Sequence, residues 1–204
     1  MGMTAALAAT TGACRKKVEP APAVTIPWIP LTGSWTGTEG GEVTEQDGVL
    51  VLPYGEQLTA AKWTGPDFPK PPFELEYEAR RVNGADFFGA VTFPARENEF
   101  VTFILGGWGG GLIGISSIDD LDASENETGS AAKFDSGKWY HIRIVRAGEK
   151  IEAWIDGEKV VDVTTDGRKL SLRAGPISAC TPFGFGSWQS TGEIKGAKWR
   201  KVEG

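Results

Sequence analysis

The sequence contains few of the residues on which most catalytic and metal sites depend. Its 204 residues include two cysteines, Cys14 and Cys180, and one histidine, His141. His141 has no serine motif near it in the sequence, so a Ser-His-Asp triad is not expected. No zinc-ligand spacing, phosphate loop or dinucleotide fingerprint is present either, so none of these sites is predicted.

An overall positive charge and long apolar runs are also missing. The formal net charge is −6, whereas a face that binds phosphate groups needs clustered Lys and Arg. No run reaches the roughly 18 apolar residues that a membrane-spanning helix requires. We therefore expect no nucleic-acid partner, and a membrane contact only through a lipid anchor.

The chain is instead rich in aromatic residues and glycine, with 8 Trp, 10 Phe and 28 Gly. From 138 to 162, apolar and polar residues alternate, and turn signals interrupt the pattern at Ala147-Gly148 and Asp156-Gly157. This period of two predicts antiparallel strands joined by tight turns. We expect Ile144 to pair with Ala153 in the first of these hairpins.

Further short strands are predicted along most of the chain beyond residue 27. Glycine-rich or proline-rich turns separate them, and no repeat of fixed period is visible. The pattern favours a single all-β domain, residues 28–204, built as a two-sheet antiparallel β-sandwich or jelly roll. The predicted strands outside the hairpin are 43–52, 58–63, 73–82, 86–93, 99–105, 112–118, 171–174, 177–179, 184–188 and 193–202.

Residues 1–27 form a leader of a different kind. Thr11-Gly12-Ala13-Cys14 resembles the end of a bacterial lipoprotein signal, in which small residues precede a cysteine that becomes lipidated. The proline-rich stretch 19–30 would then be a tether. The alternative is a disordered leader without a function. The first interpretation predicts a protein exported to the periplasm or beyond and anchored in the cell envelope.

Several strand motifs carry a resemblance to a known family. The sequence is similar to the 3-keto-disaccharide hydrolase domain (DUF1080), among the laminin-G-like and concanavalin A-like jelly rolls. The resemblance implies a concanavalin A-like fold, a glycan-handling compartment and hydrolysis of oxidised disaccharides. The matching motifs are DGVLVL at 47–52, FELEYEAR at 73–80, KWYHIRI at 138–144, AWIDGEKV at 153–160 and IKGAKWRKV at 194–202.

One departure bears on catalysis. The resemblance implies that catalytic members place carboxylates in the strand after their arginine- and asparagine-containing strand. Here that region, residues 100–118, carries no ionisable side chain. We therefore expect a module that binds glycans without cleaving them. The alternatives are a hydrolase of 3-keto-disaccharides or 3-keto-glycosides, and a structural or adhesive cell-surface module.

The polar face of the hairpin is the first candidate ligand site. His141, Arg143, Glu152 and Trp154 are expected on one face, away from the isoleucines. A tryptophan ring can stack on the apolar C–H face of a sugar while polar neighbours bind its hydroxyl groups. The alternative is an Arg–Trp stack on the surface of the sandwich.

The glycine corner 106–111, with Trp108 at its tip, is the second candidate. Glycine permits positive φ angles and close approach of the backbone to a ligand. Trp108 would be either an exposed platform for a sugar or a plug for the end of the core.

An acidic loop follows, with five carboxylates in nine residues. Carboxylate oxygens suit Ca²⁺, which takes six to eight oxygen ligands, so the loop is a candidate calcium site. The alternative is a solvated loop. The candidate ligands are Asp119, Asp120, Asp122, Glu125 and Glu127.

A second acidic group lies on the predicted strand 73–82. Glu74, Glu76 and Glu78 share one face of it, and we expect a solvent-facing strand edge rather than the catalytic pair of a glycosidase.

Overall fold

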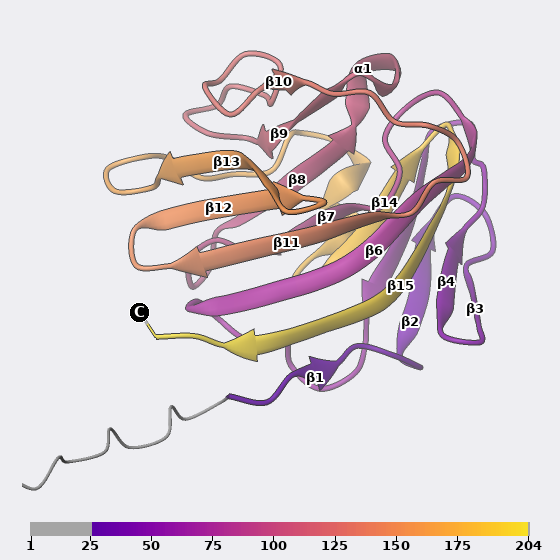
Figure 1. Ribbon diagram of the computed structural model, residues 1–204, viewed down its shortest axis with the longest axis horizontal. Coiled ribbons are helices and arrows are strands. Elements are labelled where there is room, and N and C mark those ends of the chain that lie inside the picture. Colours follow the sequence, from indigo (N-terminus) through magenta and orange to yellow (C-terminus); the bar gives the residue numbers. More distant parts are fainter. Residues whose placement is uncertain (1–25, 204) are drawn as a thin grey trace, which may run out of the picture.

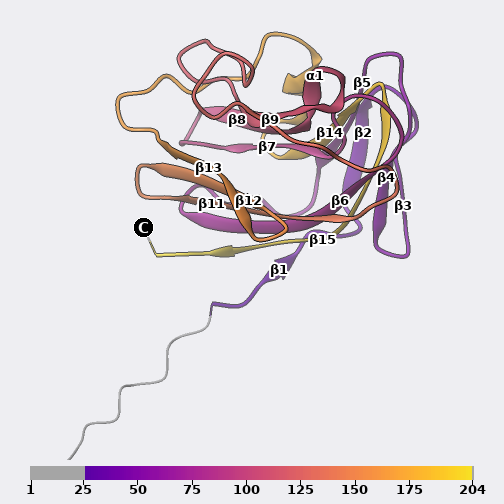
Figure 2. The ribbon, with the colours of Figure 1, turned by 45° about the horizontal axis from the view of Figure 1, so that its top comes forward.

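The computed structural model describes residues 26–203, which form two antiparallel sheets stacked face to face (Figures 1 and 2). Sheet A has the strand order β13-β12-β11-β6-β15-β4-β3, with β1 paired to β15. Sheet B has the order β10-β9-β8-β7-β14-β5-β2. The strands of sheet A are β1 Ile29–Pro30, β3 Thr44–Gln46, β4 Val49–Leu52, β6 Phe73–Gly84, β11 Tyr140–Ala147, β12 Lys150–Ile155, β13 Glu158–Thr164 and β15 Ser190–Lys201. Those of sheet B are β2 Trp35–Glu39, β5 Leu58–Trp63, β7 Ala90–Pro94, β8 Phe100–Gly106, β9 Leu112–Ser116, β10 Ser130–Ala131 and β14 Gly184–Trp188.

The core lies between the sheets because each strand turns alternate apolar side chains inward. Leu75 and Tyr77 of β6 and Ile144 of β11 project from sheet A, and Phe103 and Phe185 project from sheet B. All five are at most 1% exposed. The prediction of an all-β, two-sheet sandwich is confirmed.

The predicted hairpin register is also confirmed. Ile144 pairs with Ala153, and Arg143 pairs with Trp154. The connection is a two-residue turn, because Ala147 and Lys150 pair directly. Such a short turn requires a left-handed backbone, which Gly148 supplies with a φ of 50°.

The strands predicted at 171–174 and 177–179 are wrong. Residues 171–173 lie outside any strand, and a 3₁₀ helix, η1, spans Pro176–Cys180. Gly175 has a φ of 134° and Pro176 opens the helix, so the chain cannot continue as a strand. The apolar residues that suggested strands instead cover the outer face of sheet B, where Ile177 packs on Leu58.

Cys180 ends η1 rather than lying in a strand. It is fully buried, and its Sγ lies 3.4 Å from the carbonyl oxygen of Phe185. Burial raises the pKa of the thiol to about 12, so the folded protein keeps Cys180 protonated at neutral pH. Cys14 and the predicted lipoprotein signal lie outside the described residues.

The prediction that Glu74, Glu76 and Glu78 lie at a sheet edge is also wrong. Strand β6 is central, between β11 and β15. Glu74 is 2% exposed and accepts hydrogen bonds from Arg143 and Arg200. The alternating pattern was read correctly, but it could not distinguish a face open to solvent from one covered by long basic side chains.

Within residues 26–203, no helix has the length and apolar character needed to cross a membrane.

Candidate functional site

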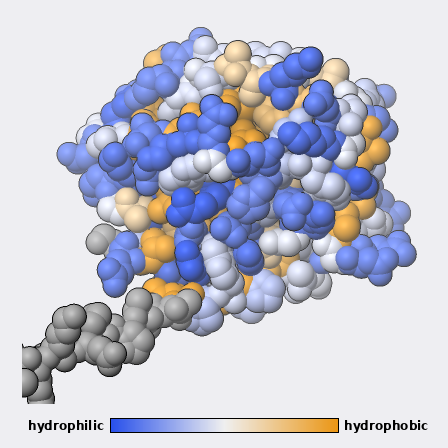
Figure 3. All heavy atoms as spheres, viewed as in Figure 1, coloured by the Kyte–Doolittle hydropathy of each residue, from blue (hydrophilic) through white to orange (hydrophobic). Residues whose placement is uncertain are grey.

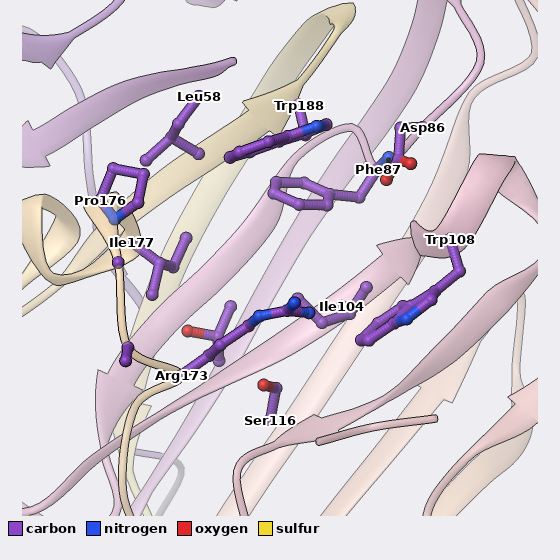
Figure 4. Close-up of a pocket in the computed structure, with 13 residues that line it drawn as sticks. Leu58, Asp86, Phe87, Ile104, Trp108, Ser116, Arg173, Pro176, Ile177 and Trp188 are labelled. Carbon is purple, nitrogen blue, oxygen red and sulfur yellow. Dashed lines mark hydrogen bonds between the residues drawn. The ribbon is translucent and has the colours of Figure 1, made fainter. Parts of the chain in front are cut away.

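A cleft of about 380 Å³ lies on the outer face of sheet B (Figure 4). Its size is within the range of small-molecule sites, about 300–1,000 Å³. Side chains from strands, loops and η1 line it, so segments far apart in the sequence meet here. The lining residues are Leu58, Asp86, Phe87, Thr102, Ile104, Trp108, Ser116, Arg173, Ala174, Gly175, Pro176, Ile177 and Trp188.

The floor of the cleft is largely apolar. Ile104 on β8 lies on the face opposite the core residues Phe103 and Leu105, as strand alternation requires. Thr102 shares this outer face, but its hydroxyl lies 2.8 Å from that of Thr92 and is hydrogen-bonded to it. The floor can therefore contact a ligand mainly through apolar surface and provides few hydrogen bonds.

Aromatic rings form the walls. Phe87 and Trp188 lie next to each other, with ring centroids 6.2 Å apart. Figure 4 shows Trp108 on the far side of Ile104 from this pair. Trp108 is 43% exposed, so its ring is available to a ligand. Flat aromatic surfaces of this kind bind the C–H faces of sugar rings.

Asp86 holds the turn that presents Trp108. One carboxylate oxygen of Asp86 accepts a hydrogen bond from the Gly109 N–H at 2.9 Å, and the other accepts one from the Phe87 N–H at 2.8 Å. Trp108 has a φ of 51°, and the neighbouring Gly109 and Gly110 have φ of 80° and 93°. Glycine lowers the cost of these left-handed positions, and the carboxylate fixes the turn against the loop between β6 and β7.

Arg173 is the basic residue of the lining. Its guanidinium carbon lies 5.6 Å from the centre of the Trp108 ring, and its Nη1 lies 3.1 Å from Asp122 Oδ2. The hydroxyls of Ser116 and Ser117 donate to the other oxygen of Asp122, at 2.6 and 3.3 Å. Asp122 therefore links Arg173 to the end of β9.

Comparison with known proteins places the chain in a family. Residues 28–203 match the model of the 3-keto-alpha-glucoside-1,2-lyase-like domain. The chain belongs to this family. The predicted resemblance is thus confirmed, although no curated protein matches the sequence.

Solved structures share the fold of this family member at low sequence identity. The Crh5 transglycosylase in complex with NAG is 13% identical, with a TM-score of 0.59 over 89% of this chain and 86% of that one. Domain 4 of AbnA, an extracellular arabinanase from Geobacillus stearothermophilus in complex with arabinotriose, is 13% identical, with a TM-score of 0.51 over 86% and 82%. A Parabacteroides distasonis protein provisionally described as a glycosyl hydrolase is 19% identical, with a TM-score of 0.51 over 86% and 100%. At these identities the likeness shows the jelly-roll fold alone.

Of the predicted ligand-binding residues, the structure brings only Trp108 to the cleft. The other four lie together on the outer face of sheet A, on the side of the molecule opposite the cleft. They are His141, Arg143, Glu152 and Trp154. Figure 3 shows that face, where hydrophilic side chains cover most of the surface. The guanidinium of Arg143 lies 4.2 Å from the centre of the Trp154 ring, so one face of that ring is covered.

The acidic loop pairs with a basic segment rather than gathering into a metal site. Asp119 and Glu127 both bind Arg168, and Asp120 lies 2.7 Å from the amine of Lys169. Of the two remaining candidate carboxylates, Asp122 pairs with Arg173 at 3.1 Å, and Glu125 accepts a long hydrogen bond of 3.4 Å from the backbone N–H of Asp122. Among residues 26–203, no three His, Cys, Asp or Glu side chains are arranged to hold a metal ion. The structure does not assemble the predicted calcium site.

Acid is expected to loosen this loop. Hydrogen bonds from the Lys169 backbone and the Arg168 side chain lower the pKa of Asp119, and those from Arg168 lower the pKa of Glu127. A carboxylate whose pKa is lower in the folded protein than in the unfolded chain stabilises the fold when it is ionised. This stabilisation is complete above the pKa of the unfolded chain, about pH 4, and is lost as the pH falls through the pKa of the folded protein. Amide hydrogen exchange in residues 119–129 should therefore accelerate below about pH 4, after correction for the intrinsic rate.

The matched variant is Arg168→Gln, which should show fast exchange in this loop already at neutral pH and little further acceleration in acid. Equal protection in both proteins at neutral pH would contradict the role assigned to Arg168.

The sequence predicted a ligand role for none of the lining residues except Trp108, and it therefore missed Asp86, Phe87, Arg173 and Trp188 among others. Phe87 and Trp188 were assigned to strands without a ligand role, and Arg173 to a strand that does not exist. The one local signal was Trp108 itself, isolated among glycines.

Proposed function

We propose that this chain is an exported, lectin-like module that binds carbohydrate in the cleft on sheet B and does not cleave it. The observation that carries the proposal is the cleft between Trp108 and the Phe87–Trp188 pair. Sugar rings present apolar C–H faces to aromatic side chains, and a few well-placed polar groups then give specificity. The known structures of the same fold in complex with NAG and with arabinotriose support a carbohydrate partner.

The ionisable side chains of the cleft favour binding over cleavage. Among residues 26–203, the ionisable side chains that line it are Asp86 and Arg173. Both oxygens of Asp86 accept hydrogen bonds from backbone N–H groups, so this carboxylate positions the Trp108 turn. The cleft then lacks the second carboxyl group that glycoside hydrolysis by an acid and a base requires.

The test is a glycan array followed by titration calorimetry with Trp108→Ala. The variant should lose about 2 kcal/mol of binding free energy, roughly 30-fold in affinity, because the stacking surface is removed. Trp154→Ala is the matched control. It removes the same side chain from the opposite sheet and should leave the affinity unchanged. Loss of binding in Trp154→Ala alone would move the site to sheet A, and binding to no glycan would overturn the proposal.

The family supports a second candidate, cleavage of 3-keto-glycosides. A ketone at C3 acidifies the hydrogen on C2, so a base can remove that proton while the C1–O bond breaks and the alcohol leaves. Asp86 is the one lining carboxylate that could accept the proton. Incubation with a 3-keto-glucoside, followed by chromatography, separates the candidates. Release of the alcohol by the native chain and its absence with Asp86→Asn would establish the enzyme and overturn the non-catalytic reading.

Export rests on the leader alone. We propose that Cys14 carries a lipid after processing, which would place the module at the cell envelope. Labelling of the protein in its host with a radioactive fatty acid should depend on this residue. Cys14→Ser is expected to abolish the label, and equal labelling of the variant would overturn the anchor.

A further inference from the structure

Arg173 differs from the other arginines in the part of the chain that the structure describes. No N–H group of its guanidinium donates a hydrogen bond with good geometry to residues 26–203, and its one charged contact is the ion pair with Asp122 at 3.1 Å. Each of the other described arginines donates at least one hydrogen bond. These are Arg80, Arg81, Arg96, Arg143, Arg146, Arg168 and Arg200.

The unused donors lie at a site where a ligand can reach them. The Arg173 side chain is 58% exposed and extends across the cleft toward Trp108 (Figure 4). The contact with Asp122 is made by Nη1, and neither Nε nor the second terminal nitrogen donates a hydrogen bond to residues 26–203, so both are available. A guanidinium offers these N–H groups as a planar fork that matches the two oxygens of a carboxylate.

The acidic groups nearby are already engaged. Asp122 accepts hydrogen bonds from Ser116 and Ser117, and Asp86 accepts two from backbone N–H groups. The overall charge of −6 opposes an anionic ligand only weakly, because charges beyond a Debye length of about 8 Å are screened at physiological ionic strength. A sugar that covers the cleft would exclude water from the Arg173 guanidinium and so strengthen the ion pair.

We propose that the cleft binds an acidic sugar, with the carboxylate of a uronic acid residue on the Arg173 fork and the pyranose ring stacked on Trp108. This inference rests on the proposed function and narrows its ligand class. The two groups are direct neighbours, because the guanidinium carbon lies over the Trp108 ring at 5.6 Å from the ring centre. A carboxylate attached directly to a sugar ring can therefore reach the arginine while the ring covers the tryptophan.

The experiment compares each acid with its own methyl ester, which keeps the sugar skeleton and removes the charge. The probes are trigalacturonic acid, a glucuronic acid disaccharide and the corresponding esters, titrated by calorimetry at neutral pH. The native chain should bind an acid about 10- to 100-fold more tightly than the ester, as hydrogen bonds to a charged group imply.

Variants test whether Arg173 causes the preference for the acid over the ester. Arg173→Gln should bind acid and ester with equal affinity. Arg173→Lys should retain part of the preference, because an ammonium group gives charge without the fork. Lys169→Gln is the matched control: it removes one positive charge from the same segment, outside the cleft lining, and should keep the full preference. Trp108→Ala should weaken both ligands.

The outcomes separate this inference from the proposed function. Equal binding of acid and ester by the native chain, or a preference that survives in Arg173→Gln, overturns the acidic-sugar site and leaves glycan binding intact. Binding of neither probe nor any neutral glycan overturns both.

Discussion

Replacing Glu74 by alanine is expected to lower the free energy of unfolding by about 3 kcal/mol, because it leaves two arginines without their shared buried partner. The Glu74 side chain is 3% exposed, and its two oxygens bind Arg143 and Arg200 from the neighbouring strands β11 and β15. The carboxylate thus joins three strands of sheet A. Urea unfolding followed by tryptophan fluorescence measures the change.

Glu76→Ala is the control on the same strand and the same face. Glu76 contacts Lys198 at 3.1 Å and His141 at 3.8 Å, and its side chain is 18% exposed. More accessible ion pairs contribute about 1 kcal/mol or less, so this variant should lose much less stability. Equal losses in the two variants would contradict the role of burial at Glu74.

The hairpin shows what the sequence could predict. In β11 and β12 one face is buried, so a shift of one residue would turn the isoleucines to solvent and the charged residues to the core. The alternation therefore fixed the register, and Ile144 pairs with Ala153 as expected. Strand alternation does not reveal what covers the polar face. That is why Glu74 was assigned to solvent although Arg143 and Arg200 bury it.

The segment before β14 shows where local patterns fail. Ile177 and Ala179 lie on either side of Ser178, as apolar residues alternate in a strand, yet Gly175 and Pro176 start a 3₁₀ helix. Ile177 and Ala179 are partly buried against the outer face of sheet B, and Cys180 is buried there. Apolar residues are needed both for packing on the outer face of a sheet and for packing in the core between the sheets. The apolar pattern of this segment therefore could not show which of the two surfaces it covers.

The cleft could not be predicted as a unit, because its lining comes from segments that meet only in the folded protein. Asp86 and Gly109 are 23 positions apart, and their hydrogen bond places Trp108. Arg173 reaches the same place from the other end of the chain. The sequence identified Trp108 because glycines flank it. The other wall residues come together only in the folded protein.

Phe185→Ala should produce the other large loss of stability, about 3–5 kcal/mol. Phe185 is fully buried, and its ring packs on Tyr77 of sheet A, on Trp35 of sheet B and on Phe183, with centroid distances of 4.9, 5.3 and 5.7 Å. Truncation removes contacts between the two sheets and leaves a cavity that the rigid strands fill poorly. Since 1 kcal/mol corresponds to about 2–4 °C for a chain of this size, the melting temperature in calorimetry should fall by roughly 6–20 °C.

The control is Tyr54→Ala, which removes an aromatic ring that is 54% exposed. It should change the free energy of unfolding by no more than about 0.5 kcal/mol.

Measurement of glycan affinity shows whether the Phe185 variant loses stability alone or function as well. Trp188 lies three residues further along β14 on the outer face, so the folded fraction of Phe185→Ala should keep its glycan affinity within a few-fold. Trp108→Ala should show the reverse, with native stability and lost affinity. A Phe185→Ala protein as stable as the native chain would mean that this ring does not hold the sheets together.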